Sequence, residues 1–116
     1  MKNRPLHERL GFAMAGLRTG WLREGSFRTQ GIAAFAALVA LIVIRPSAIW
    51  WALVAVVAAM VLALELLNSA IEGLVDLLHP GLHPEIKAIK DMIAGAVLIV
   101  SLAALAVAAA LAIATL

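Results

Sequence analysis

The chain has 116 residues, of which 65% are hydrophobic and 14% charged, and its mean hydropathy is +1.06. Because soluble domains are about half apolar and about a quarter charged, this composition excludes a soluble domain and intrinsic disorder. The absence of cysteine excludes disulfides, thiolate metal sites and cysteine nucleophiles. The net charge of +2 is too small and too localised to indicate a protein that binds nucleic acid. The composition predicts an integral membrane protein with a single domain over residues 1–116.

Apolar side chains recur every three or four residues in the N-terminal segment. The stripe consists of Leu6, Leu10, Met14, Leu17 and Trp21. A helix with such a stripe and with arginines beside it is typical of a segment that lies in the membrane interface. The alternative is a helix that packs on the rest of the protein and turns its polar face to water. The sequence predicts an amphipathic interfacial helix over about 6–25.

Three uncharged apolar runs follow, over residues 31–44, 47–64 and 92–116. One membrane crossing needs about 20 apolar residues, so the first helix is expected to begin earlier, near Ser26. Arg45-Pro46 separates the first two runs, because proline disfavours helix in the residue before it. The expected fold is an all-α membrane protein with one interfacial helix and three transmembrane helices. The spans are expected at about 28–45, 47–77 and 84–115.

The distribution of basic residues predicts the orientation in the membrane. Six of the nine Lys and Arg residues precede the first span, and Lys87 and Lys90 flank the start of the third. The connection between the first two spans carries only Arg45. By the positive-inside rule, we expect the N-terminus and the connection over residues 76–91 in the cytoplasm, with the C-terminus on the other side.

The second span continues into a polar stripe. Glu65, Asn68, Glu72 and Asp76 are spaced by three, four and four residues, which places them within an arc of about 80° on one helix face. Three carboxylates on one face repel each other and are costly near lipid. A bound metal ion, or basic side chains of a neighbouring helix, is therefore expected to compensate them. From spacing alone, an ion-paired structural seam between helices is the alternative.

The next helix supplies a basic side chain near this stripe. The segment 79–83 predicts a short reversal, and Pro84 suits the first turn of a new helix. If the hairpin turns about Gly81, Glu72 lies level with Lys90. Carboxylates that hold Mg²⁺ beside a lysine suit a polyphosphate, and a further carboxylate could take a proton from a lipid hydroxyl. The pattern indicates phosphoryl transfer at the membrane surface, without a Walker-type or kinase glycine-rich loop.

A motif that extends from the second span into the third resembles the motif of a known protein family. It reads Glu65-Leu-Leu-Asn68-Ser69-Ala70-Ile71-Glu72, with Asp76 four positions later and Lys90-Asp91 opening the last span. This pattern closely resembles the prokaryotic diacylglycerol kinase family, which includes undecaprenol kinases, and the similarity extends over about residues 12–99. The resemblance implies an ATP-dependent, Mg²⁺-requiring enzyme that phosphorylates diacylglycerol to phosphatidic acid. It also implies a homotrimer with active sites shared between subunits, in the bacterial cytoplasmic (inner) membrane.

The resemblance further implies a role for individual residues, position by position. Glu65 corresponds to the general base, and Asn68 to a polar residue that supports catalysis. Glu24 and Glu72 correspond to the Mg²⁺ ligands, which also contact ATP. The other ATP contacts correspond to Asp76, His83, Lys90 and Asp91. The lipid substrate is expected to be bordered by Arg18, Trp21, Ser26, Phe27, Arg28, Gln30, Glu65, Ser69 and Ala94.

The sequence also departs from the family pattern. Gln30 stands where an acid is common, and Phe12-Ala13 stands where a Tyr-Ser pair is common, so hydrogen bonds to substrate from these positions are expected to be lost or altered. Arg4 and Arg9 are both candidates for an N-terminal nucleotide contact. The loop 83–87 also resembles the undecaprenol kinase branch. Undecaprenol is therefore the alternative acceptor, and a non-catalytic three-helix membrane protein is the remoter alternative.

Overall fold

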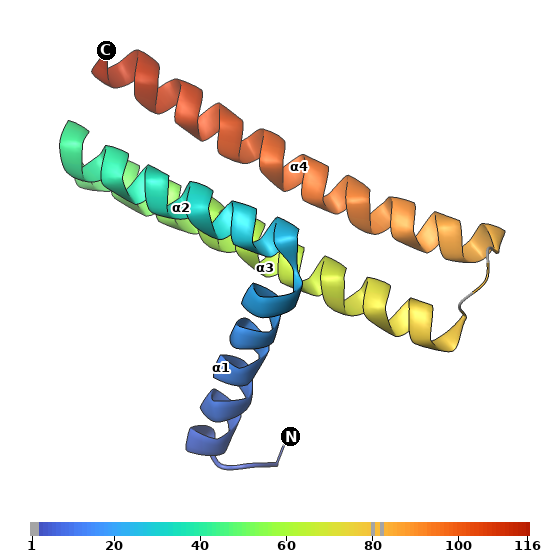
Figure 1. The fold of residues 1–116 in the computed structure, drawn as a ribbon. Coiled ribbons are helices and arrows are strands. Elements are labelled where there is room, and N and C mark those ends of the chain that lie inside the picture. Colours follow the sequence, from blue (N-terminus) through green and yellow to red (C-terminus); the bar gives the residue numbers. More distant parts are fainter. Residues whose placement is uncertain (1–2, 80, 82) are drawn as a thin grey trace.

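The computed structural model describes residues 3–79, 81 and 83–116, and in these ranges the chain forms four helices. They are α1 (Leu6–Arg23), α2 (Gly25–Ile44), α3 (Ala48–Leu78) and α4 (Pro84–Thr115). Helix α3 contacts both α2 and α4, and α1 projects away from these three (Figure 1). Each of α2, α3 and α4 is long and apolar enough to cross a membrane. The predicted all-α fold with three candidate spans is confirmed.

The chain bends between α1 and α2 at Glu24. This residue has an extended backbone (φ −109°, ψ 108°), and it is both the C-cap of α1 and the N-cap of α2. Most of α1 is exposed, including the stripe expected to face lipid, while Gly20 in its last turn is buried. The helix therefore touches the rest of the molecule near its C-terminal end, and its position in the membrane interface stays a prediction.

Short connections join the three long helices. Arg45 ends α2 in the left-handed conformation (φ 54°, ψ 54°), with its N–H donating to the Leu41 carbonyl at 2.9 Å. Pro46 follows and cannot continue a helix. At the other end, α3 stops at Leu78, fourteen residues beyond its uncharged run over 47–64.

The start of α4 has the signals that end a turn and begin a helix. His83 is the N-cap, and its Nδ1 accepts the Glu85 N–H at 3.1 Å, while Pro84 occupies the first helical position. Proline suits that position because its missing N–H would have no helical partner. Helices α3 and α4 run antiparallel to each other on either side of this turn (Figure 1). The polar end of α3 therefore lies beside the basic start of α4.

Candidate active site

The polar stripe on α3 passes from a buried to an exposed environment. Glu65 is 6% exposed, Asn68 and Glu72 are half-buried, and Asp76 lies exposed near the hairpin. The stripe begins one turn beyond Val61, a buried residue of the apolar part of the same helix. This gradient follows from the sequence, because the stripe extends from the apolar run of α3 to its polar end.

The buried part of the stripe is not neutralised within the described chain. Among the described residues no ion pair includes Glu65. The buried Oδ1 of Asn68 has no hydrogen-bond partner there. A structural seam would pair these groups, because an unpaired buried polar group costs free energy. Their arrangement fits a site that completes its bonds with a ligand, and it disfavours the seam.

Lysine reaches the exposed end of the stripe. Lys90 Nζ donates to Asp76 Oδ1 at 2.8 Å. The sequence placed Lys90 level with Glu72, whereas its closest partner in the structure is one helical turn nearer the hairpin. The register and rotation of α4 against α3 account for this difference. The expectation that Lys90 faces the carboxylate stripe is confirmed.

Two further predicted nucleotide contacts lie near the hairpin. Asp91 accepts from Lys87 at 2.6 Å on its own helix, and both side chains are exposed. His83 is committed to capping α4 through Nδ1. Exposed ion pairs of this kind are weak, so the Asp91 carboxylate remains able to exchange Lys87 for another donor or a cation.

Glu24, which lies between α1 and α2, is next to a different face of α3 from the face that carries Glu72. It lines a cavity of about 530 Å³ between α1 and α3. Ser69 and Gly73 line the same cavity, whereas Glu72 does not. On a helix of 100° per residue, the face of α3 at Gly73 is rotated by about 100° from Glu72. The two expected metal ligands are thus not brought into one cavity within a single chain.

The carboxylates nevertheless suit a metal ion that arrives with a nucleotide. The described residues contain no group of three or more His, Asp or Glu side chains arranged to hold a metal. Mg²⁺ is usually held by one or two carboxylates together with phosphate oxygens and water. Neither Glu24 nor Glu72 has an ion pair with another described side chain. They therefore fit as ligands of a nucleotide-bound ion better than as parts of a resident cage.

The elbow between α1 and α2 gathers several residues that were expected to border the lipid. Phe27 is buried against Gly20, and the ring of Trp21 lies over Gly31. Arg28 Nη1 donates to the carbonyls of Trp21 at 2.8 Å and of Leu22 at 3.2 Å. Three residues expected at the same border are more open, with their side chains at the surface: Arg18, Ser26 and Ala94.

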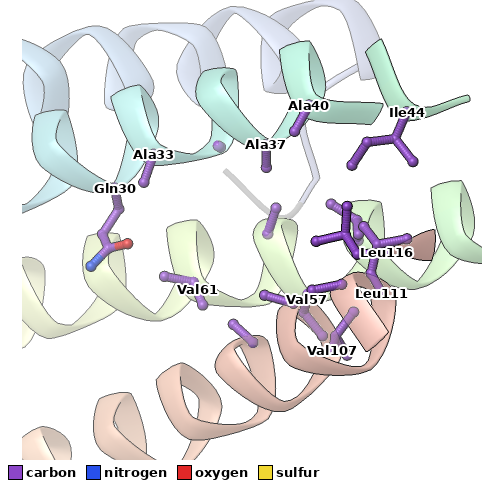
Figure 2. Close-up of a pocket in the computed structure, with 16 residues that line it drawn as sticks. Gln30, Ala33, Ala37, Ala40, Ile44, Val57, Val61, Val107, Leu111 and Leu116 are labelled. Carbon is purple, nitrogen blue, oxygen red and sulfur yellow. The ribbon is translucent and has the colours of Figure 1, made fainter. Parts of the chain in front are cut away.

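A second cavity, of about 340 Å³, lies between α2, α3 and α4 (Figure 2). Gln30 stands at one end of it, and Ile44 and Leu116 stand toward the other. Gln30 is the one polar side chain among the described residues that line this cavity, and the rest are Ala, Val, Ile and Leu. Val61 lines it near Gln30, so Glu65 follows one turn later on the same face of α3.

The residues that line this cavity were missed by the search for polar motifs. Their signal in the sequence is a stripe of small side chains on α2, at Ala33, Ala37 and Ala40. Small residues of this kind also favour close helix packing. The sequence therefore could not distinguish a cavity wall from a packed interface.

The fold is that of a multi-pass membrane protein, in which the buried residue Glu65 lies between an apolar cavity and the end of the polar stripe that Lys90 of α4 contacts. The family model for prokaryotic diacylglycerol kinase matches residues 11–112. The chain belongs to this family.

Curated relatives have related activities. Diacylglycerol kinase of Escherichia coli (strain K12) is 37% identical over 89 residues, which cover 77% of this chain and 73% of that protein. Diacylglycerol kinase of Synechocystis sp. is 35% identical, over 83% of this chain and 55% of the relative. Undecaprenol kinase of Bacillus subtilis (strain 168) is 40% identical over 74 residues, which cover 64% and 60% of the two chains. The family and these names identify a lipid kinase.

Proposed function

We propose that the protein transfers the γ-phosphoryl group of ATP to the primary hydroxyl of diacylglycerol, which yields phosphatidic acid. The single observation that supports this most directly is the position of Glu65. Glu65 is a buried residue, its carboxylate is unpaired among the described residues, and it lies one turn from the apolar cavity that Val61 lines. The hydroxyl of a lipid whose hydrocarbon chains lie in the membrane would meet a proton acceptor at that boundary.

The chemistry follows from the carboxylate stripe. Glu65 accepts the hydroxyl proton, the hydroxyl oxygen attacks the γ-phosphorus in line, and ADP leaves with the electrons of the broken bond. Asn68, with its unpaired Oδ1 beside the base, supports this arrangement. Lys90 exchanges Asp76 for phosphate oxygens, with Asp91 and His83 as further nucleotide contacts. Mg²⁺ held by Glu24 and Glu72 would neutralise phosphate charge.

The proposed active unit is a homotrimer in the bacterial inner membrane, with its N-terminus in the cytoplasm and its sites shared between subunits. The separation of Glu24 from the Glu72 face of α3 supports sharing, because one chain alone leaves the two ligands in different surroundings. The orientation rests on the basic residues of α1 and of the hairpin, since cytoplasmic segments are enriched in Lys and Arg.

Undecaprenol is the second candidate acceptor. The relative from Bacillus subtilis supports it, and so does the cavity, whose lining is apolar except for Gln30. Both candidate lipids carry a primary hydroxyl together with long hydrocarbon chains. The same base and the same nucleotide contacts would serve either of them.

The test is transfer of labelled phosphate from ATP by purified protein in bilayers that contain either diacylglycerol or undecaprenol. Glu65→Gln is expected to lower turnover by at least about 10²-fold. Glu85→Gln, which removes an exposed carboxylate at the start of α4, is the matched control and is expected to keep turnover. Near-normal turnover in Glu65→Gln would refute the mechanism. Labelled undecaprenyl phosphate alone would transfer the proposal to the second acceptor, and no transfer to either lipid would refute both.

A further inference from the structure

Arg28 connects two helices through backbone carbonyls. Its Nη1 donates to the carbonyl oxygens of Trp21 and Leu22 in the last turn of α1, at 2.8 and 3.2 Å. The last four carbonyls of a helix lack partners within the helix, and a cation at this end also interacts favourably with the helix dipole. Arg28 belongs to the first turns of α2, so these two bonds fasten the end of one helix to the start of the next.

The direction of this guanidinium leaves Glu24 unpaired. Arg28 follows Glu24 by four residues, and its own N–H donates to the Glu24 carbonyl at 3.1 Å. Within the described chain, however, no ion pair joins the two side chains, and the Glu24 carboxylate does not cap α2 either. The guanidinium passes over Gly25, where a Cβ would lie 3.7 Å from Nη2.

Two apolar contacts reinforce the same elbow. A Cβ on Gly20 would lie 3.4 Å from the Phe27 ring, and one on Gly31 would lie 2.7 Å from the ring of Trp21. Each contact joins a residue of α1 to a residue of α2, and each depends on a glycine at the point of closest approach. Arg28 thus completes an elbow whose two helices are held at several points along the bend.

We propose that Arg28 is a positioning residue, which fixes the α1–α2 elbow so that the free carboxylate of Glu24 is presented toward the cavity beside α3. This inference rests on the proposed function, in which Glu24 holds nucleotide-bound Mg²⁺. In this proposal Arg28 affects the reaction through the position of the Glu24 carboxylate, and not through a direct contact with the lipid.

Helix orientation gives a test that does not depend on activity. The chain has no cysteine, so cysteines placed at the exposed positions Met14 on α1 and Leu38 on α2 accept spin labels without background. Labelled chains diluted with unlabelled chains in bilayers report the distance within one chain. Arg28→Ala is expected to broaden or shift the distance distribution, and Arg28→Lys to restore part of it. An unchanged distribution in Arg28→Ala would overturn the proposal.

Thr29→Val is the matched control for this elbow. Thr29 Oγ1 donates to the Gly25 carbonyl at 3.0 Å within α2, so the substitution removes a side-chain bond from the same turn without touching α1. The distance distribution of this variant is expected to match that of the parent. If Thr29→Val broadens the distribution as much as Arg28→Ala, the effect belongs to the start of α2 in general and the proposal fails.

Steady-state kinetics distinguish a positioning role of Arg28 from a direct contact between Arg28 and the lipid. In Arg28→Ala, the concentration of Mg²⁺ at half-maximal rate is expected to rise by about tenfold or more, because small displacements of a ligand have large effects. The lipid KM is expected to stay unchanged, and Arg28→Lys to recover part of the Mg²⁺ response. A rise in lipid KM with an unchanged Mg²⁺ response would overturn the proposal. An inactive parent protein would refute the proposed function, while the distance measurement would still decide whether Arg28 holds the elbow.

Discussion

Replacing Gly20 with alanine is expected to disturb the contact between α1 and α3. Gly20 is buried, and a Cβ there would overlap Cδ1 of Leu66 on α3 and lie 3.4 Å from the Phe27 ring. Crowding a packed site costs about 1–3 kcal/mol, whereas alanine favours a helix over glycine by about 1 kcal/mol. The net change in the free energy of unfolding is therefore expected between about zero and 2 kcal/mol of destabilisation.

The Leu66 side chain, which causes the overlap, can be removed by substitution. In a Leu66→Ala background the alanine at position 20 has room, so the same substitution is expected to become neutral or to stabilise by up to about 1 kcal/mol. The interaction energy between positions 20 and 66 is then about 1–3 kcal/mol, from the crowding cost that disappears. A double-mutant cycle measures this quantity directly.

The assay is unfolding in mixed micelles by titration with a denaturing detergent, followed by circular dichroism. Gly11→Ala is the matched control, because a Cβ at Gly11 on the same helix meets nothing within 4 Å among the described residues. It is expected to stabilise α1 by helix propensity alone. If Gly20→Ala changes the unfolding free energy equally with Leu66 and with alanine at position 66, the proposed contact between α1 and α3 is refuted.

Two further predictions concern the carboxylate stripe. Asn68→Leu is expected to keep or raise the free energy of unfolding, because the buried Oδ1 has no described hydrogen bond to lose. Turnover is expected to fall in the same variant. A loss of more than about 1 kcal/mol of unfolding free energy in the same titration would contradict this prediction. Lys90→Met is expected to raise the ATP concentration at half-maximal rate by about tenfold or more through loss of a charged hydrogen bond. Unfolding should change little, since the pair with Asp76 is exposed. Lys87→Met, which removes another lysine of the same helix one turn earlier, should leave the ATP dependence near that of the parent. Equal effects of the two substitutions would contradict the role of Lys90.

Much of the candidate site follows from properties of single helices. The spacing of Glu65, Asn68, Glu72 and Asp76 puts them on one face because the helical repeat is local and independent of neighbours. The three candidate spans were also predictable, because length and hydropathy are properties of each segment.

The relations between helices were not predictable in the same way. Lys90 reaches Asp76 rather than Glu72, which depends on the register and rotation of α4 against α3. The position of Glu24 in the cavity between α1 and α3 depends on the angle of the elbow at one extended residue. Arg28, which the sequence assigned to the lipid border, donates to backbone carbonyls.

An all-α protein with three candidate membrane spans and a polar stripe on the second could be predicted from the amino-acid sequence, because composition and helical periodicity act over a few turns of one segment. The side chains that lie on either side of that stripe depend on how the helices pack. In the tertiary structure an apolar cavity lies one turn before Glu65 and a lysine lies at the opposite end. Both depend on how side chains far apart in the chain pack against each other, and no local pattern specifies that packing.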